Sequence, residues 1–189
     1  MVATPVLQVS DSVDLRPATK SILPAMLDAY HEDSEAAQTA LPWLDPNDDV
    51  RRQLRDMLYD IQAQHGTDTL HFWGIHDRSN DEFLGLIGLG DELQSLHSDF
   101  SLGYWVRLKH RRRGLASTCV DAVLNWLAQR EGSTVVEIAV HPRNAAGLAT
   151  AGAICQRWNG EHLEEFIGIE FKERTVPHHL HLVEVGQGA

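Results

Sequence analysis

The strongest structural signal in this chain is a basic turn between a predicted strand and a predicted helix. Residues 107–113 hold five of the 16 Lys and Arg side chains, in a protein whose formal net charge is −11. No Asp or Glu lies between Asp99 and Asp121 to neutralise them locally. Residues 100–108 alternate apolar and polar side chains as a strand does, and Gly114 opens an apolar helical pattern. Because the N–H groups and dipole of a helix start attract anions, the segment predicts a phosphate-binding turn.

A basic run can also be a solvated surface or a localisation signal. Neither alternative explains the strand before the turn, the glycine inside it, or the small residues Ala116 and Ser117 after it. The net charge of −11 opposes broad nucleic-acid binding, because the rest of the protein would repel a phosphate backbone. It suits a cationic second substrate such as an amine. We therefore predict a phosphate-bearing ligand and no nucleic-acid partner.

Length and composition are those of a soluble globular protein. The 189 residues, 43% of them hydrophobic and 23% charged, predict a single domain over 1–189, with a flexible segment at 1–12 and a tail at 186–189. No apolar run approaches the roughly 20 residues that cross a bilayer, and no secretory signal is visible. Cys119 and Cys155 are too few for a disulfide or metal framework. These observations predict a cytoplasmic protein that does not bind membranes.

Hydrophobic periodicity predicts an α+β fold. Helices are expected over 21–35, 47–65, 114–130 and 144–158. Strands are expected over 13–17, 70–76, 82–89, 100–108, 135–140, 163–171 and 179–185. This order predicts a central mixed, mostly antiparallel sheet flanked by helices, with a right-handed β-α-β unit around the basic turn. Ligands should bind where the direction of the strands switches.

The turn and its surroundings resemble the GNAT acetyltransferases, and within them the RimJ/RimL-type branch. Arg111-x-x-Gly114-x-Ala116 matches the family motif Gln/Arg-x-x-Gly-x-Gly/Ala. Further matches are Leu15-Arg16-Pro17, Leu41-Pro42-Trp43-Leu44, Gly103-Tyr104-Trp105-Val106 and an Asn144 after the next strand. The likeness covers about residues 13–145.

The resemblance implies a GNAT-like fold with a β-α-β acyl-CoA-binding core. It implies an acetyl-CoA-dependent N-acetyltransferase, with acetyl-CoA as co-substrate and no metal. The acceptor would be a primary amine of a protein N-terminus or a small molecule, acetylated by direct transfer within a ternary complex. Homodimer formation stays open.

The resemblance assigns CoA binding to three groups of residues. The phosphates would be bound by Arg111, Arg112, Arg113, Gly114, Leu115, Ala116 and Ser117. The pantetheine arm would bind the backbone of Trp105, Val106 and Arg107, where one N–H would polarise the thioester carbonyl. Asn144 would contact the arm, and it is equally expected as a helix N-cap.

The residues expected to act as general acid or base depart from the family pattern. No Tyr follows Tyr104, the position of the usual Ser is Gly147, and the closing Gly-Phe is absent. The substitutes are Asp99 and Ser101 at the start of a strand and His141 at the end of the next one, with Asp91 and Glu92 as competitors. Each is also explained as an ordinary turn or loop residue.

Trp43 and Tyr104 are expected to wall the acceptor pocket, although each also fits a structural aromatic. His179 and His181 share a strand face without a third ligand, so no metal site is predicted. The missing proton donors keep two alternatives open. One is a non-catalytic acyl-CoA-binding or regulatory module, and the other is a transferase for another acyl group such as succinyl.

Overall fold

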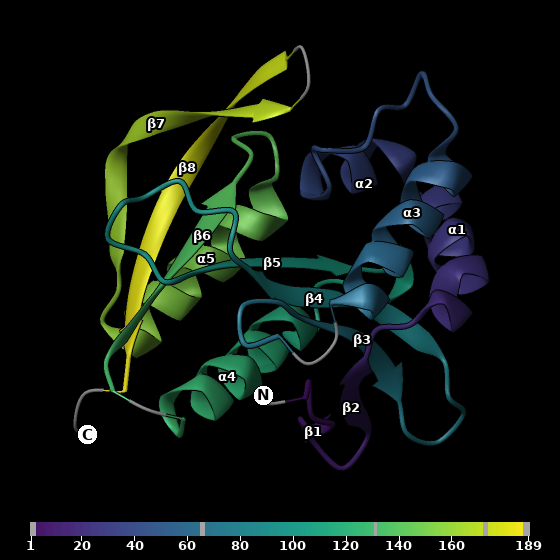
Figure 1. Ribbon diagram of the computed structural model, residues 1–189, viewed down its shortest axis with the longest axis horizontal. Helices are drawn as coiled ribbons and strands as arrows, with labels where there is room; N and C mark the ends of the chain where they lie inside the picture. Colours follow the sequence, from purple (N-terminus) through teal and green to yellow (C-terminus); the bar gives the residue numbers. More distant parts are fainter. Residues whose placement is uncertain (1–2, 65–66, 131, 172–173, 187–189) are drawn as a thin grey trace.

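The computed structural model describes residues 3–64, 67–130, 132–171 and 174–186. Within these residues the α+β prediction is confirmed. One mixed sheet has the strand order β1-β2-β3-β4-β5-β6-β8-β7, and helices flank it (Figure 1). No described helix has the length and apolar character needed to span a membrane.

The element bounds follow the predicted order closely. The strands are β1 (Leu7–Gln8), β2 (Val13–Pro17), β3 (His71–Asp77), β4 (Phe83–Gly90), β5 (Phe100–Val106), β6 (Thr134–Val140), β7 (Glu161–Phe171) and β8 (Arg174–Val185). The helices are α1 (Leu23–Glu32), α2 (Ser34–Ala40), α3 (Val50–Ala63), α4 (Leu115–Ala128) and α5 (Ala145–Trp158). A short 3₁₀ turn over Leu108–His110 ends β5 two residues earlier than predicted.

Part of the N-terminal segment, which is expected to be flexible, contacts the sheet. Leu7 pairs with Leu15 of β2 in an antiparallel bridge. The indole N–H of Trp73 donates to the carbonyl of Pro5 at 2.7 Å. The described part of 1–12 is therefore attached to the sheet by hydrogen bonds that leave no periodic sequence signal. Most of the predicted tail, residues 187–189, lies outside the described residues.

The predicted helix over 21–35 is divided into α1 and α2 at Asp33. The backbone of Asp33 leaves the helical region (φ −160°, ψ 78°), and its carboxylate accepts a hydrogen bond from the N–H of Ala36 at 3.1 Å. Asp favours such a cap because its side chain replaces a missing helical hydrogen bond. The break sets the direction of α2.

Two hydrophobic cores lie on opposite faces of the sheet. One contains Val123 of α4 and Ile154 of α5 together with Ile138 of β6. The other contains Leu58 of α3 and Met26 of α1, with further side chains from α2, β4 and β5. The sheet is thus covered by α4 and α5 on one face and by the N-terminal helices on the other (Figure 1).

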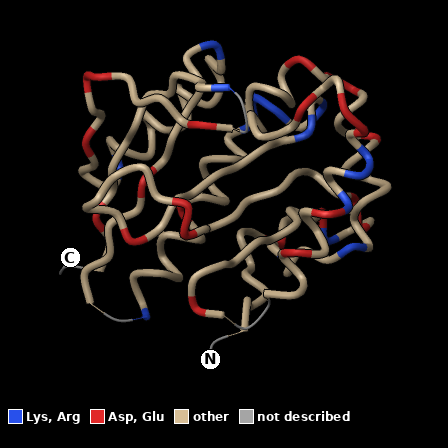
Figure 2. The backbone as a smooth tube through the Cα atoms, turned by 45° about the horizontal axis from the view of Figure 1, so that its top comes forward, with Lys and Arg blue, Asp and Glu red and all other residues tan. Residues whose placement is uncertain are grey.

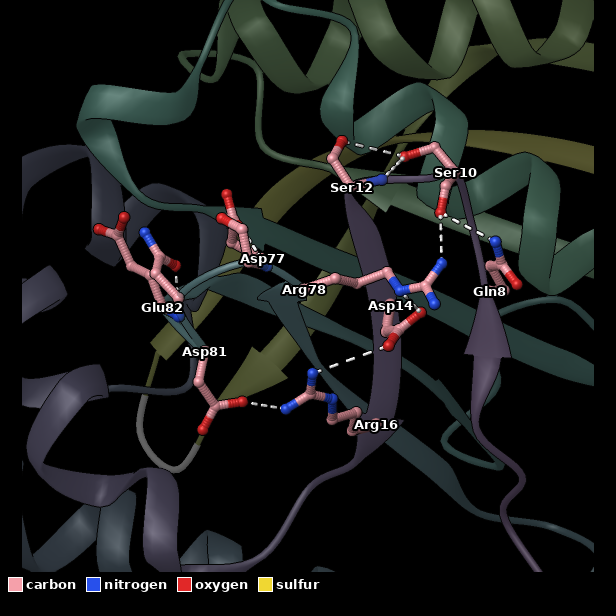
Figure 3. Close-up of polar contacts among 11 residues, drawn as sticks. Gln8, Ser10, Ser12, Asp14, Arg16, Asp77, Arg78, Asp81 and Glu82 are labelled. Atoms are coloured by element: carbon pink, nitrogen blue, oxygen red, sulfur yellow. Dashed lines mark hydrogen bonds and ion pairs between the residues drawn. The ribbon is translucent and has the colours of Figure 1, made fainter.

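A polar cluster joins the β1–β2 turn to the β3–β4 turn (Figure 3). Arg16 forms an ion pair with Asp81, and the Nε of Arg78 lies 3.4 Å from a carboxylate oxygen of Asp14. The cluster fixes the β3–β4 turn, which ends at Glu82. This matters for the site because Glu82 contacts the basic turn.

The sheet opens between β5 and β6. These two strands run parallel but pair only at Phe100–Val136 and Ser101–Glu137. Farther on, β5 stays paired with β4 as far as Val106, and β6 stays paired with β8. The opening lies where the strand direction switches, which is where a ligand is predicted to bind.

Candidate active site

A cleft of about 860 Å³ lies at this opening. Its walls come from α2 and the loop after it, the end of β5, the basic turn, the first turns of α4 and α5, and the start of β8. The predicted site residues that line it are Tyr104, Trp105, Val106, Arg111, Arg112, Gly114, Leu115, Ala116, Ser117, His141 and Asn144. The structure therefore brings most of the predicted binding residues together.

Gly114 caps the N-terminus of α4. Its φ of +73° lies in the left-handed region that glycine adopts without strain. A Cβ atom there would meet no atom within 4 Å, so it would project into open space. No side chain among the described residues caps the helix, so the first N–H groups of α4, from Leu115 on, remain available. With the helix dipole, they give the start of α4 the positive character that favours an anion.

Much of the basic turn is neutralised by distant carboxylates. The Nε of Arg107 lies 2.6 Å from Glu32, and Lys109 forms an ion pair with Glu82. The hydrogen bond from Lys109 lowers the pKa of Glu82. In Figure 2, segments carrying Lys and Arg alternate with segments carrying Asp and Glu along one side of the molecule. The sequence around the turn suggests that these side chains are free cations. The fold, however, places carboxylates from distant segments beside Arg107 and Lys109.

Arg111 connects three parts of the cleft wall. Its Nε donates to the carbonyl of Val106 at 2.8 Å, and its Nη1 lies 2.7 Å from the carboxylate of Asp33. The pKa of Asp33 is lowered, mainly by the N–H of Ala36 and further by Arg111. The guanidinium therefore holds the start of α2 against the end of β5.

Arg112 and Arg113 differ from their neighbours in the turn. Both are exposed, and neither forms a salt bridge with any residue that the structure describes. Arg112 lines the cleft, and Arg113 is adjacent to the Gly114 cap. These two side chains are the free cations beside the N-terminus of α4. Arg107 and Arg111, which the sequence groups with them, are engaged by the protein.

The backbone of β5 presents hydrogen-bonding groups to the opening. The N–H of Arg107 donates to the carbonyl of Leu84 at 2.8 Å, on the β4 side. Because antiparallel strands alternate the direction of their peptide groups, those of Tyr104 and Val106 point away from β4. The carbonyl of Val106 is bound by Arg111. The N–H of Val106 is therefore directed into the gap between β5 and β6.

Asn144 acts as the N-cap of α5, which is one of its two predicted roles. Its Oδ1 accepts from the N–H of Gly147 at 2.9 Å. A Cβ at Gly147 would lie 2.6 Å from the Asn144 amide nitrogen, so glycine leaves room for the cap. The hydroxyl of Tyr104 donates to the Gly147 carbonyl at 2.9 Å. Burial raises the pKa of Tyr104, so the phenol is protonated at neutral pH.

His141 lines the cleft next to α5. Burial lowers its pKa, as do the nearby His178 and Arg143 charges, so the ring is neutral at pH 7. Its Nδ1 accepts from the N–H of Arg143 at 3.1 Å, which places the proton of the neutral ring on Nε2. In this arrangement His141 is a hydrogen-bond donor to the cleft rather than a free base.

Asp99 and Ser101 do not lie with the other predicted site residues. Asp99 accepts from the N–H of Val135 at 2.8 Å, and Ser101 pairs within the sheet at the closed end of β5. Three residue steps along the strand, about 10 Å, lead from Ser101 to Tyr104, the first residue of β5 that lines the cleft. Both residues therefore lie where β5 and β6 are paired, rather than at the opening between them.

Trp43 packs against the core beneath the N-terminal helices instead of lining the cleft. Arg107 and Arg113 are likewise outside the lining.

Among the described residues, no three His, Cys, Asp or Glu side chains gather in a way that could hold a metal ion. Burial raises the pKa of the Cys119 thiol to about 12, which keeps it protonated.

Several lining residues have no counterpart in the sequence prediction. They are Glu35, Gln38 and Thr39 of α2, Arg143 before α5, and Arg174 and Val176 of β8. The only available signal was Asp33, a favoured N-cap residue inside a predicted helix. Arg174 lay outside the predicted strands, because β8 begins five residues before the expected start at 179.

A sheet that opens beside a glycine-capped helix N-terminus is a fold that binds phosphate-bearing ligands, and sequence comparison identifies the family. The acetyltransferase (GNAT) domain family matches residues 13–154. The chain therefore belongs to the GNAT acetyltransferase family, as the motif resemblance predicts.

Solved structures show the same fold at low sequence identity. A RimL ribosomal L7/L12 α-N-protein acetyltransferase in complex with coenzyme A has a TM-score of 0.76 at 16% identity, covering 97% of this chain and 100% of that one. A protein from Vibrio cholerae with a proposed ribosomal-protein-serine acetyltransferase function has a TM-score of 0.75 at 15% identity, covering 97% and 99%. The microcin C7 self-immunity acetyltransferase MccE, in complex with acetyl-CoA and AMP, has a TM-score of 0.71 at 10% identity, covering 92% and 93%. A search of curated proteins gave no match.

Proposed function

We propose that this protein transfers an acetyl group from acetyl-CoA to a primary amine by direct transfer within a ternary complex. The observation that carries the proposal is the continuous cleft from the N-terminus of α4 to the opening between β5 and β6. Coenzyme A in the RimL structure and acetyl-CoA in the MccE structure support the choice of donor. The acceptor belongs to a protein N-terminus or to a small molecule.

The cleft offers separate groups to the two parts of the donor. The N–H groups at Gly114 and Leu115, with the Arg112 and Arg113 side chains, suit the phosphates. The pantetheine arm is amide-rich, and it would extend beside the free backbone edge of Tyr104 and Val106. The backbone of β5 would form hydrogen bonds with the pantetheine amides, as it would with a neighbouring strand.

The free backbone edge of β5 also suits the acetyl-transfer step. The N–H of Val106 would donate to the thioester oxygen and stabilise the negative charge that forms when the amine attacks. The attacking nitrogen must lose a proton, and the departing CoA sulfur must gain one. The hydroxyl of Tyr104 already donates to the Gly147 carbonyl. His141, which carries its proton on Nε2 beside the start of α5, is therefore the side chain best placed to donate a hydrogen bond to the leaving sulfur.

Release of free CoA thiol in the presence of a panel of amines and N-terminal peptides tests this function. We expect thiol release that depends on both acetyl-CoA and the amine, with the acetylated amine as product. Tight acetyl-CoA binding without turnover of any amine would favour the non-catalytic module instead. Faster turnover with succinyl-CoA than with acetyl-CoA would identify the other acyl group.

The two kinds of arginine in the basic turn should respond differently to substitution. We expect the double variant Arg112→Ala/Arg113→Ala to raise the KM for acetyl-CoA about tenfold and to reduce its dependence on salt, because it removes charge-assisted contacts to phosphate. Arg107→Ala should mainly lower the melting temperature, because its guanidinium bonds Glu32. Steady-state kinetics at two salt concentrations and thermal unfolding measure both effects. An unchanged KM in the double variant would contradict the assignment.

A further inference from the structure

The arginines of this chain fall into two groups. Most form salt bridges with carboxylates. Across the described residues, those without such a partner are Arg51, Arg112, Arg113, Arg143 and Arg174. In a chain of net charge −11, carboxylates are abundant, yet none of the described ones pairs with these five arginines. All of these except Arg51 lie in the cleft wall or in the basic turn beside it.

Arg143 and Arg174 belong to a different part of the cleft from the basic turn. Arg143 precedes α5, and Arg174 begins β8, where its Nη2 lies 3.4 Å from the carbonyl of Pro42 and 3.5 Å from that of Leu44. Figure 1 shows the start of β8 at the top of the molecule near α2, with α4 at the bottom. If the donor enters at the N-terminus of α4, the acceptor must approach its thioester from the remaining part of the cleft.

The charges in that part of the cleft do not suit a simple alkyl amine. The described carboxylates in the wall belong to Asp33, which Arg111 neutralises, and Glu35. Arg143 and Arg174 outnumber Glu35 in this part of the cleft, and their positive charges would repel an isolated ammonium group. Arginine instead binds carboxylates, through paired hydrogen bonds with a planar fork of donors. An acceptor that carries carboxylates next to its amine would supply the missing partners.

We propose that Arg143 and Arg174 select an acidic acceptor, in which carboxylates follow closely on the amine that is acetylated. A peptide N-terminus with Asp or Glu at its second and third positions has this chemistry. The inference rests on the proposed acetyl transfer and narrows its substrate class. It also replaces the expectation that the acidic surface serves to attract a cationic acceptor.

Three peptides that share a first residue of alanine, followed by two Glu, two Gln or two Lys residues, test the proposal. We expect the wild-type protein to acetylate the Glu peptide with a kcat/KM about tenfold above that of the Gln peptide. The difference should shrink at high salt, because exposed charges are screened. Arg143→Glu and Arg174→Glu should each remove this preference and favour the Lys peptide, while the KM for acetyl-CoA stays within about twofold.

Arg51→Glu provides the matched control. Arg51 is an exposed, unpaired arginine of α3 outside the cleft wall, so the substitution changes the net charge equally. Equal loss of preference in this variant would overturn the proposal, as would a wild-type protein that does not distinguish the three peptides. Arg143→Gln and Arg174→Gln should give intermediate losses. The melting temperature of Arg143→Gln should match the wild type, because its side chain forms no ion pair with a described residue. That of Arg174→Gln should fall slightly, because its Nη2 donates to the carbonyls of Pro42 and Leu44.

Binding of the fluorescently labelled Glu peptide to the CoA-saturated protein separates this proposal from the proposed function. Binding that the two Glu variants abolish, without any acetylation, would refute acetyl transfer but support recognition of an acidic acceptor by Arg143 and Arg174. Acetylation of all three peptides at equal rates would support acetyl transfer and refute this recognition. Free glutamate, tested alongside, distinguishes a small amino-acid acceptor from a peptide. Faster acetylation of glutamate than of the Glu peptide would overturn the peptide assignment while retaining carboxylate recognition.

Discussion

Gly114→Trp should abolish acetyl-CoA binding, with loss of the ligand-induced rise in melting temperature and at least about a 100-fold fall in kcat/KM. The glycine occupies a left-handed conformation with open space where a Cβ would project. An indole in that space would cover the first N–H groups of α4 and displace the phosphates. The positive φ adds about 1–2 kcal/mol of backbone strain. Thermal unfolding with and without acetyl-CoA measures both effects.

Gly132→Trp is the control for strain alone. Gly132 also has a positive φ of +64° and no atom within 4 Å of its Cβ position, but it follows the opposite end of α4. It should lose a similar amount of stability and keep the full ligand-induced rise. A rise of wild-type size in Gly114→Trp would show that the donor does not bind at the N-terminus of α4.

The sequence predicts this fold well where the signal is local. Alternation over residues 100–108 and the apolar spacing after Gly114 predict a strand and a helix, which form as β5 and α4. The β-α-β unit follows, because parallel neighbouring strands need a crossover. The position of the glycine-capped turn between β5 and α4 could therefore be predicted from fewer than twenty residues.

Tertiary contacts explain what could not be predicted. The partners of Arg107 and Arg111 are Glu32 and Asp33, more than seventy residues away, and no local pattern announces them. The fold also decides which end of a strand faces the opening. Asp99 immediately precedes β5 and Ser101 lies at its start, while Val106 ends the same strand, yet β6 pairs with the first end and leaves the second. Polar residue type alone cannot distinguish these two ends.

Val106→Pro should lower kcat about 100-fold to 1000-fold relative to Val106→Ala. Proline removes the N–H that faces the gap between β5 and β6, which is the donor proposed for the thioester oxygen. The β4–β5 ladder should survive, because its hydrogen bonds at this end use the N–H of Arg107. Single-turnover acetylation measures the chemical step directly.

Val106→Ala is the matched variant because both substitutions reduce the packing of a side chain that is only 8% exposed. Their shared loss of stability therefore cancels in the comparison, and the N–H remains the main difference. Acetyl-CoA should still raise the melting temperature of Val106→Pro, since the phosphate-binding groups of α4 are unchanged. Equal kcat values for the two variants would remove Val106 from the chemistry. The charge on the thioester oxygen would then need another donor, and the N–H on Nε2 of His141 would be the first to test.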